Sequence, residues 1–190
     1  MNDYEGKNLL RATEYLRRVA LRGGIVLFVG TKQPVCELVK REASRCRMPY
    51  VNDRWVGGTL TNFGTTLNRL HYWEKQWSLL ETIVDVARTG IKRTSGQRAI
   101  LREYNRMQRT AGLREMRGLP ECLVIVDPLS EQGASGEARK MGITTIGLVE
   151  VGGAACNVNL AIPTILEDVG SIEFVVSRLV DAVLDGGWRV

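Results

Sequence analysis

The apolar residues of this chain follow two different spacings, which alternate along most of the sequence. Continuous apolar runs cover residues 25–29 and 122–126, and shorter or less regular apolar runs cover residues 50–51, 144–149 and 160–162. Runs of this length without polar interruption are typical of strands buried on both faces of a sheet. Helical spacing of apolar residues marks residues 8–21, 34–47, 130–141 and 170–184. The alternation predicts an α/β fold with a parallel sheet and helices on both faces, and Ser130 is the expected N-cap of the third of these helices.

The middle of the chain departs from this alternation. Between residues 65 and 87 the apolar positions are separated by 3, 4, 3, 4 and 3 residues, at Leu70, Trp73, Trp77, Leu80, Val84 and Ala87. This spacing is typical of a coiled-coil seam, and a second amphipathic helix is predicted over residues 97–111. We therefore expect a coiled-coil helical hairpin, residues 65–117, inserted into one discontinuous α/β domain, residues 1–64 and 118–190. The alternative is that both helices pack flat on the sheet, because the aromatic side chains exceed what a thin seam needs.

Positive charge is concentrated in this insertion. The net charge of the chain is +5, but residues 88–117 alone hold nine basic and two acidic side chains, a net +7 that leaves −2 for the remainder. This asymmetry is expected when one part of a surface binds a polyanion. A merely solvated helix face, the alternative, usually has acidic partners four residues away, which are scarce here. The side chains of the segment that could bind such a polyanion, RNA or DNA, are Arg88, Lys92, Arg93, Arg98, Arg102, Arg106 and Arg109.

Residues 52–63 read Asn-Asp-Arg-Trp-Val-Gly-Gly-Thr-Leu-Thr-Asn-Phe and have the composition of a binding loop. Arg54 can form a bidentate contact with a phosphate, and Trp55 can stack on a base or fill a pocket. Gly57 and Gly58 permit a positive φ or the close approach of a partner. The alternative is a glycine turn before a helix cap, with Trp55 in the core. Further side chains that could bind the phosphate or sugar of a nucleic acid are Lys32, Thr59 and Asn62.

An enzyme with this fold would bind its ligand beyond the carboxyl ends of the strands. The candidates there are Gly30, Thr31, Lys32, Asp127 and Glu150. Gly-Thr-Lys lacks the spacing of a phosphate-binding loop, and an Asp before a proline is also a frequent entry to a helix. The single histidine, His71, falls on the predicted insertion. We therefore expect no catalytic residue, no cofactor and no small-molecule substrate. The alternative is an enzyme or sensor domain that binds a sugar phosphate or nucleotide at these strand ends.

Cysteine spacing and the lengths of the apolar runs show whether a metal-binding or a membrane-spanning protein is to be expected. The four cysteines, at positions 36, 46, 122 and 156, show no C-x-x-C spacing, so no metal site is expected. Cys36 and Cys122 lie among apolar residues, which suits a protein of a reducing compartment. No apolar run reaches the length that spans a bilayer, so we expect no membrane partner.

Four motifs occur in a fixed order: Phe-Val-Gly-Thr-Lys at residues 28–32, Arg-Trp-Val-Gly-Gly-Thr-Leu-Thr-Asn at 54–62, Gly-Leu-Pro at 118–120 and Val-Ile-Val-Asp at 124–127. In order and spacing they resemble the S-two family of small-subunit ribosomal proteins, in its bacterial and organellar form. The resemblance implies a flavodoxin-like sheet that binds no nucleotide and carries a protruding coiled coil. It also implies a structural protein that binds small-subunit rRNA and neighbouring small-subunit ribosomal proteins.

The sequence departs from the family pattern in two places. Family members usually start with a segment that contributes rRNA contacts, whereas this sequence begins after it, so we expect those contacts to be missing or supplied by another protein. After residue 149, Glu-Val-Gly-Gly replaces an Asp-Thr-Asn turn, and the acidic turn after Pro163 is shifted to Glu167 and Asp168. With 20 arginines against six lysines, this divergence favours a mitochondrial ribosome over the alternatives of bacterial cytoplasm and plastid stroma.

Overall fold

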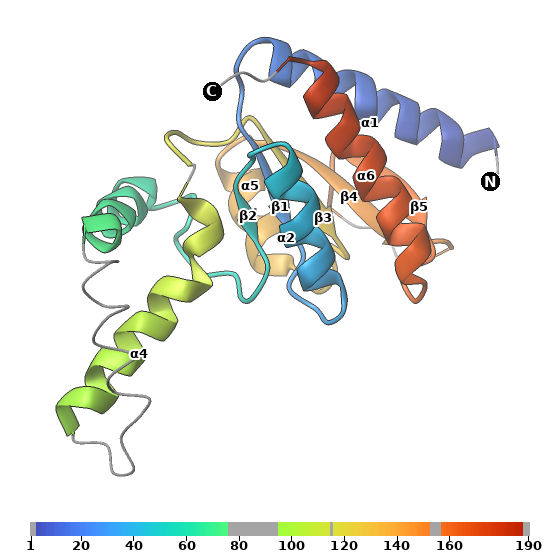
Figure 1. Ribbon diagram of the computed structural model, residues 1–190. Coiled ribbons are helices and arrows are strands. Elements are labelled where there is room, and N and C mark those ends of the chain that lie inside the picture. The colour runs from blue at the N-terminus through green and yellow to red at the C-terminus, as the bar shows by residue number, and fades with distance from the viewer. Residues whose placement is uncertain (1–2, 76–94, 115, 153–156, 188–190) are drawn as a thin grey trace.

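Five parallel strands form a sheet that is covered by helices on both faces (Figure 1). The computed structural model describes residues 3–75, 95–114, 116–152 and 157–187. The strands are β1 (Val26–Val29), β2 (Tyr50–Val51), β3 (Cys122–Val126), β4 (Thr144–Glu150) and β5 (Leu160–Thr164). Their order in the sheet is β2-β1-β3-β4-β5, and each neighbouring pair is parallel. This order is the one found in flavodoxin-like folds, so the predicted α/β class with a parallel sheet is confirmed.

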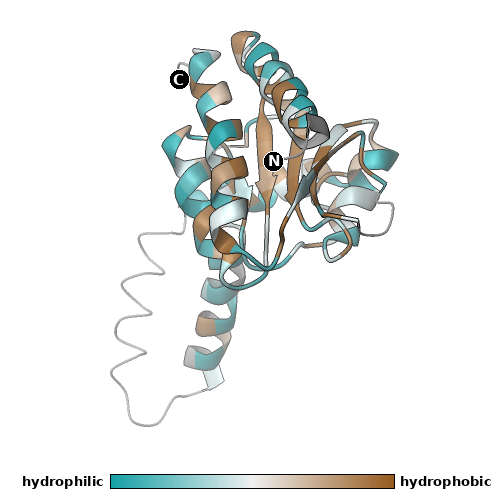
Figure 2. Cartoon of the chain, turned by 90° about the vertical axis from the view of Figure 1, so that its right-hand side faces the viewer, coloured by the Kyte–Doolittle hydropathy of each residue, from teal (hydrophilic) through white to brown (hydrophobic). Residues whose placement is uncertain are grey.

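Each face of the sheet is covered by its own helices because successive strand residues point to opposite faces. On one face, Val26 and Phe28 pack in a cluster with residues of α1 (Asp3–Leu21), α2 (Val35–Arg45) and α6 (Val169–Asp185). On the other face, Leu27 and Val29 pack in a second cluster that includes two alanines of α5 (Gln132–Lys140). Figure 2 shows predominantly apolar strands at the centre of the molecule, between helices that carry both polar and apolar residues. None of the helices within the described ranges is long and apolar enough to cross a membrane.

The start of α5 differs from the prediction. Its N-cap is Glu131, without a side-chain capping bond, so the prediction that Ser130 is the N-cap is wrong. Asp127 has a positive φ of 56°, and the turn that follows brings the Ser130 hydroxyl to 2.6 Å from Asp127 Oδ2. Ser130 therefore closes the turn after β3 through its side chain and is not available to α5. By contrast, the N-cap of α6 is Asp168, whose carboxylate accepts from the amides of Gly170 and Ser171.

The insertion is anchored to the second face of the sheet at its base. Figure 1 shows α4 (Ser95–Arg109) extending away from the sheet and leading back through a 3₁₀ turn, η1 (Ala111–Leu113). Leu70 and Trp73 of the helical segment 63–75, together with Tyr104 and Met107 of α4, belong to the second apolar cluster. Residues 76–94, with the remaining seam positions, lie outside the described ranges. The coiled-coil hairpin therefore stays a prediction.

Gly112 fixes how closely this base approaches the sheet. A Cβ at this position would lie 2.3 Å from the backbone oxygen of Tyr50 in the edge strand β2. Only glycine allows η1 to approach the strand this closely. The end of α4 and the loop that follows β2 are consequently brought side by side.

Candidate nucleic-acid interface

The loop that follows β2 is folded around a single carboxylate, that of Glu137 on α5. Glu137 Oε1 accepts hydrogen bonds from Trp55 Nε1 at 3.0 Å and from the Gly58 amide at 2.8 Å. Its Oε2 accepts from the amides of Leu60 at 2.9 Å and Thr61 at 3.1 Å, and from the Thr61 hydroxyl at 3.2 Å. A loop leaves amide groups without secondary-structure partners, and here one ionised side chain supplies the acceptors. The loop is thereby fixed to α5.

Hydrogen bonding keeps this carboxylate charged despite its partial burial. Burial alone raises the pKa of Glu137, but the bonds from Trp55 and from the amides of Leu60, Thr61 and Gly58 outweigh it. The resulting pKa lies below its ordinary value of 4.5. Glu137 is therefore ionised at neutral pH and can hold all its donors.

The two glycines of the loop have different roles. Gly58 has a φ of +87°, which is the first of the two roles considered for this pair, a positive φ or the close approach of a partner. Gly57 has no positive φ, and a Cβ placed there would meet nothing within 4 Å. The fold therefore requires glycine at position 58 and leaves the surface at position 57 open.

Trp55 combines the two roles that the sequence left open. Its ring is half-buried against the second apolar cluster, beside Gly133 of α5, where a Cβ would lie 3.0 Å from Trp55 Cδ1. The same residue also lines a groove at the surface. Trp55 thus packs the loop against α5 and also forms part of the exposed surface of the loop.

This groove, which we call the arginine groove, is lined by the loop, by the helical segment 63–75 and by the end of α4. Its volume is about 550 Å³. Among its lining residues are three arginines and three aromatic residues, Arg54, Arg69, Arg109, Trp55, Tyr72 and Trp73, and the acidic lining residue is Glu103. Basic and aromatic side chains together are the combination that binds phosphates and unstacked bases.

The side chains of the arginine groove are arranged so that they can exchange partners. The Arg109 guanidinium lies 3.2 Å from Asp53 Oδ2, and both side chains are about half exposed, at 50% and 54%. An exposed ion pair of this kind is worth little, so a phosphate can replace Asp53. Arg54 has no ion pair or hydrogen bond within the described part of the chain. Tyr72 is 57% exposed.

Trp73 forms the more rigid wall of the groove. Its indole Nε1 donates to Glu103 Oε1 at 3.1 Å, and the Arg69 guanidinium lies over its ring at 5.8 Å from the centroid. A guanidinium stacked on an aromatic face is held in place by the ring quadrupole. Arg69 is therefore oriented before any ligand arrives.

The remaining RNA-binding candidates are distributed over three places. Arg98 and Arg102 are exposed on α4, and Arg106 belongs to the same helix. Lys32 lies at the strand ends and does not line the arginine groove. Arg88, Lys92 and Arg93 lie outside the described residues.

Two candidates of the loop serve its own geometry. Thr59 is only 3% exposed, and its hydroxyl donates to the Val56 carbonyl at 2.5 Å. Asn62 Oδ1 accepts from the Thr65 hydroxyl at 2.8 Å, at the start of the helical segment 63–75. Both side chains fix the turn that leads from the loop into the helix.

The strand ends, where an enzyme of this fold would bind its ligand, are closed by internal hydrogen bonds. Thr31 donates its amide at 3.1 Å and its hydroxyl at 2.5 Å to Glu131 Oε1. Lys32 Nζ lies 2.6 Å from Asp127 Oδ2. The donors that would hold a phosphate are thus already bonded to carboxylates.

The charge of the adjoining cavity opposes a phosphate ligand. Burial raises the pKa of Asp127, but the bonds from Lys32 and Ser130 outweigh it, and the pKa lies below its ordinary value. The cavity has a volume of about 340 Å³, and its charged lining residues are Lys32, Asp127, Glu150 and Glu167. Negative charge predominates there, so the site repels anions.

The three described thiols and the histidine are not gathered into a metal site. The structure, over the residues it describes, contains no group of three or more His, Cys, Asp or Glu side chains suited to hold a metal ion. Cys36, Cys46 and Cys122 are buried free thiols, and burial raises the pKa of Cys46 to about 11. Such thiols act as small apolar side chains. His71 is exposed on the helical segment 63–75.

Three residues that shape this interface were missed by reasoning from the sequence. Glu137 lies 76 to 82 residues from the loop that it holds, and no local pattern connects the two. Arg69 and Tyr72 were not named as candidates, although Arg69 stands three residues before Tyr72 and four before Trp73, a spacing that places it beside both on a helix. The signal that could have found them was the cluster of aromatic and basic residues between positions 69 and 73.

These features define a class: an α/β protein with a flavodoxin-like sheet, closed strand ends and a basic, aromatic surface groove. The sequence profile described as Ribosomal protein S2 matches residues 5–186, and the chain belongs to this family. The predicted family is therefore confirmed, and with it the structural ribosomal role and the non-enzymatic character of the family.

Two relatives illustrate the match. The chain is 42% identical over 183 residues to the "Small ribosomal subunit protein uS2" of Rhodopirellula baltica, an alignment that covers 95% of this chain and 68% of the relative. It is 38% identical over 178 residues to the "Small ribosomal subunit protein uS2c" of Cyanidioschyzon merolae, covering 94% of this chain and 77% of the relative.

Proposed function

We propose that the protein is a scaffold of the small ribosomal subunit that binds rRNA through the arginine groove and the exposed arginines of α4. The observation that carries this proposal is the arrangement of Arg54, Arg69 and Arg109 around the exposed Tyr72. Membership of the ribosomal protein S2 family supports the small subunit as the place where this surface acts. The protein contributes binding and shape to the particle and no chemical step.

The chemistry of the groove suits structured RNA. A guanidinium can form two parallel hydrogen bonds to a phosphate, and an exposed ring can stack on a base that has left a helix. The exposed arginines of α4, Arg98 and Arg102, lie four residues apart and therefore on one side of the helix. They extend the positive surface beyond the groove, as a continuous sugar-phosphate backbone requires.

The insertion is the element that we assign to reach beyond the α/β domain. In this proposal, residues 65–117 form the coiled-coil hairpin, and residues 1–64 and 118–190 form the domain that carries it. The base of the insertion is fixed by the apolar contacts of Leu70, Trp73, Tyr104 and Met107. Neighbouring small-subunit proteins are the further partners that we propose.

A salt titration of RNA binding tests the proposal. Changing Arg54, Arg69 and Arg109 to Ala should weaken binding to small-subunit rRNA transcripts. It should also flatten the slope of log K against log salt by about 0.7–0.9 for each phosphate that the variant no longer neutralises. The matched control changes Arg11, Arg22 and Arg139, three exposed arginines elsewhere on the surface, to Ala. Equal affinities and slopes for the two variants would refute the arginine groove as the binding surface.

The cellular compartment is proposed from fewer observations than the ribosomal role. The ribosome as the location follows from the family, and the relatives above are a bacterial uS2 and a plastid uS2c. A mitochondrial ribosome rests on the excess of arginine over lysine and on the altered turns after β4 and β5. Neither relative is named as mitochondrial. Sedimentation of the tagged protein with mitochondrial small subunits supports this proposal, and sedimentation with bacterial or plastid subunits refutes it.

A further inference from the structure

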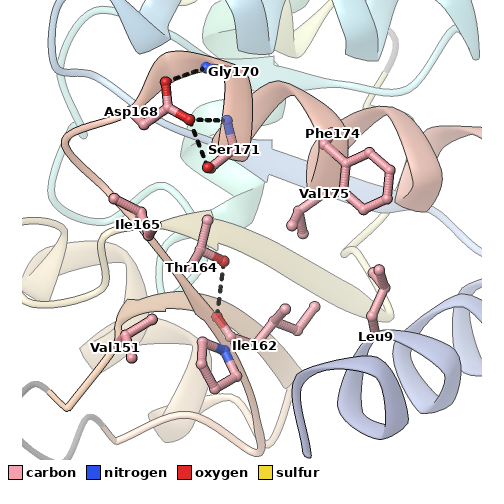
Figure 3. Close-up of a pocket in the computed structure, with 11 residues that line it drawn as sticks. Leu9, Val151, Ile162, Thr164, Ile165, Asp168, Gly170, Ser171, Phe174 and Val175 are labelled. Atoms are coloured by element: carbon pink, nitrogen blue, oxygen red, sulfur yellow. Dashed lines mark hydrogen bonds between the residues drawn. The ribbon is translucent and has the colours of Figure 1, made fainter. Parts of the chain in front are cut away.

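A second groove, of a different character, lies at the carboxyl end of β5 (Figure 3). We call it the apolar groove, and its volume is about 670 Å³. Leu9 of α1 and Phe174 of α6 lie at one end in Figure 3, whereas Val151 and Ile165 lie at the other. Asp168 is the ionisable residue among those that line it. The walls are thus formed almost entirely by apolar and small side chains.

The exposure of these side chains is unusual for a solvated surface. Ile165 is 53% exposed, Val151 48%, Phe174 46% and the adjacent Val169 36%. Single exposed apolar residues are common on proteins and need no explanation. A cluster around one hollow marks an interaction site instead.

The polar groups of the apolar groove are already bonded within the protein. Asp168 accepts from the amides of Gly170 at 3.2 Å and Ser171 at 2.9 Å, and from the Ser171 hydroxyl at 2.6 Å. The Thr164 hydroxyl donates to the Ile162 carbonyl at 3.1 Å. An occupant is therefore bound mainly through apolar contacts, with few unmet donors to recognise.

The edge of β5 is poorly suited to accept another strand. Pro163 in the middle of β5 has no amide hydrogen to donate, and proline at an edge prevents regular strand pairing. The Asn8 side chain of α1 already donates to the Ala161 carbonyl at 2.9 Å. The occupant consequently inserts side chains into the groove and does not extend the sheet.

Charge beside the groove selects the kind of occupant. The last residue of β4, Glu150, and the described loops after β1, β3 and β5 carry five carboxylates in all, Asp127, Glu131, Glu150, Glu167 and Asp168, and one lysine, Lys32, which is paired with Asp127. At the other end, Arg178 lies over the Phe174 ring at 5.4 Å from its centroid. An RNA backbone is repelled by the acidic side, whereas lysine or arginine side chains are attracted to it.

We propose that the apolar groove docks a segment of a neighbouring protein. The segment inserts an aliphatic or aromatic side chain between Phe174 and Ile165 and carries Lys or Arg residues toward the acidic strand ends. The molecule then has two separate surfaces, a basic one for RNA and an apolar, acid-flanked one for protein.

Photo-crosslinking in assembled small subunits tests this proposal. The photoreactive p-benzoylphenylalanine replaces Ile165 in one full-length variant and Phe174 in another, and both positions are exposed enough to tolerate it. Mass spectrometry should identify a crosslink from both positions to the same segment of another protein. The same probe at Tyr72, in the arginine groove, should crosslink to rRNA, and its failure would bear on the proposed RNA surface alone.

A charge reversal supplies the second arm. Glu167→Lys in the crosslinking variants should lower the yield to the partner segment about threefold or more, whereas Glu37→Lys on α2 should leave it unchanged. Leu21, which is 59% exposed at the end of α1 and away from the carboxyl ends of the strands, provides the background level. Crosslinks from positions 165 and 174 to rRNA, to a second copy of this chain, or at the level of the Leu21 control would each overturn the proposal. A yield unaffected by Glu167→Lys would overturn its electrostatic part.

Discussion

Glu137 decides the conformation of the binding loop at the scale of single residues. Its two carboxylate oxygens hold the Trp55 indole, three backbone amides and one hydroxyl. Replacing it by Gln removes the charge and turns one acceptor into a donor that faces other donors. We expect Glu137→Gln to lower the free energy of unfolding by about 1–3 kcal/mol, measured by urea denaturation. Glu37→Gln, at an exposed position of α2, is the control that should change little.

Glu137 also makes part of the free energy of unfolding depend on pH. The pKa of Glu137 is lower in the folded chain than its ordinary value of 4.5. Its contribution is therefore complete above that value and is lost as the pH falls through the folded-state pKa. The difference in stability between wild type and Glu137→Gln should accordingly shrink on going from pH 7 to strongly acidic solution. A difference that grows with acid would contradict the hydrogen-bonding account of this loop.

Gly57 and Gly58 provide a matched pair of positions. Gly58 has a φ of +87°, where an L-residue is strained, whereas Gly57 has no positive φ and open space around it. Gly58→Ala should lower the free energy of unfolding by about 1–3 kcal/mol, and Gly57→Ala should leave it nearly unchanged. Thermal denaturation of both variants decides this. If Gly57→Ala weakens rRNA binding without loss of stability, a partner approaches the backbone there.

At the scale of the elements, α4 carries part of the positive charge that the sequence concentrates in residues 88–117, and we propose that its exposed arginines bind rRNA. Reversing Arg98 and Arg102 to Glu should reduce incorporation into small subunits and flatten the salt dependence of rRNA binding. The fold should be unaffected, because both side chains are exposed. Reversing Arg139 and Lys140 at the end of α5 is the control of equal charge. Equal incorporation of the two variants would mean that α4 faces protein or solvent.

In contrast to the α4 variants, a substitution at the carboxyl ends of the strands should leave incorporation into small subunits unchanged. Asp127 holds Lys32 and Ser130 in the turn after β3, and an enzyme would need this carboxylate for its ligand. Asp127→Asn keeps an acceptor for Ser130 and removes an exposed ion pair, which is worth little. We expect normal assembly of small subunits, measured by sedimentation. If the wild-type protein gained thermal stability with a nucleotide or sugar phosphate and the variant did not, the strand ends would be a ligand site after all.

At the scale of the whole molecule, the sequence predicted the elements better than the contacts between them. Short apolar runs that alternate with helical spacing are typical of buried parallel strands, and β1, β3, β4 and β5 were located within one or two residues. The N-cap of α5 was wrong because the positive φ of Asp127 redirects Ser130. That conformation depends on the surrounding fold.

The interface was predicted only in part, for the same reason. Arg54, Trp55 and Arg109 were named from composition, and the structure brings them together in one groove. Thr59 was named with them, yet it is buried because its hydroxyl closes the turn on Val56. Glu137, Arg69 and Tyr72 were not foreseen, since their role depends on α5 and the helical segment 63–75 folding against the loop.

A cryo-EM map of the native small subunit containing this protein tests the central claim most directly. The predicted result is an rRNA phosphate within hydrogen-bonding distance, roughly 2.7–3.2 Å, of at least one guanidinium among Arg54, Arg69 and Arg109. A base should also lie against the Tyr72 ring. A map in which the arginine groove faces solvent or another protein, with rRNA bound only elsewhere on the chain, would contradict the account.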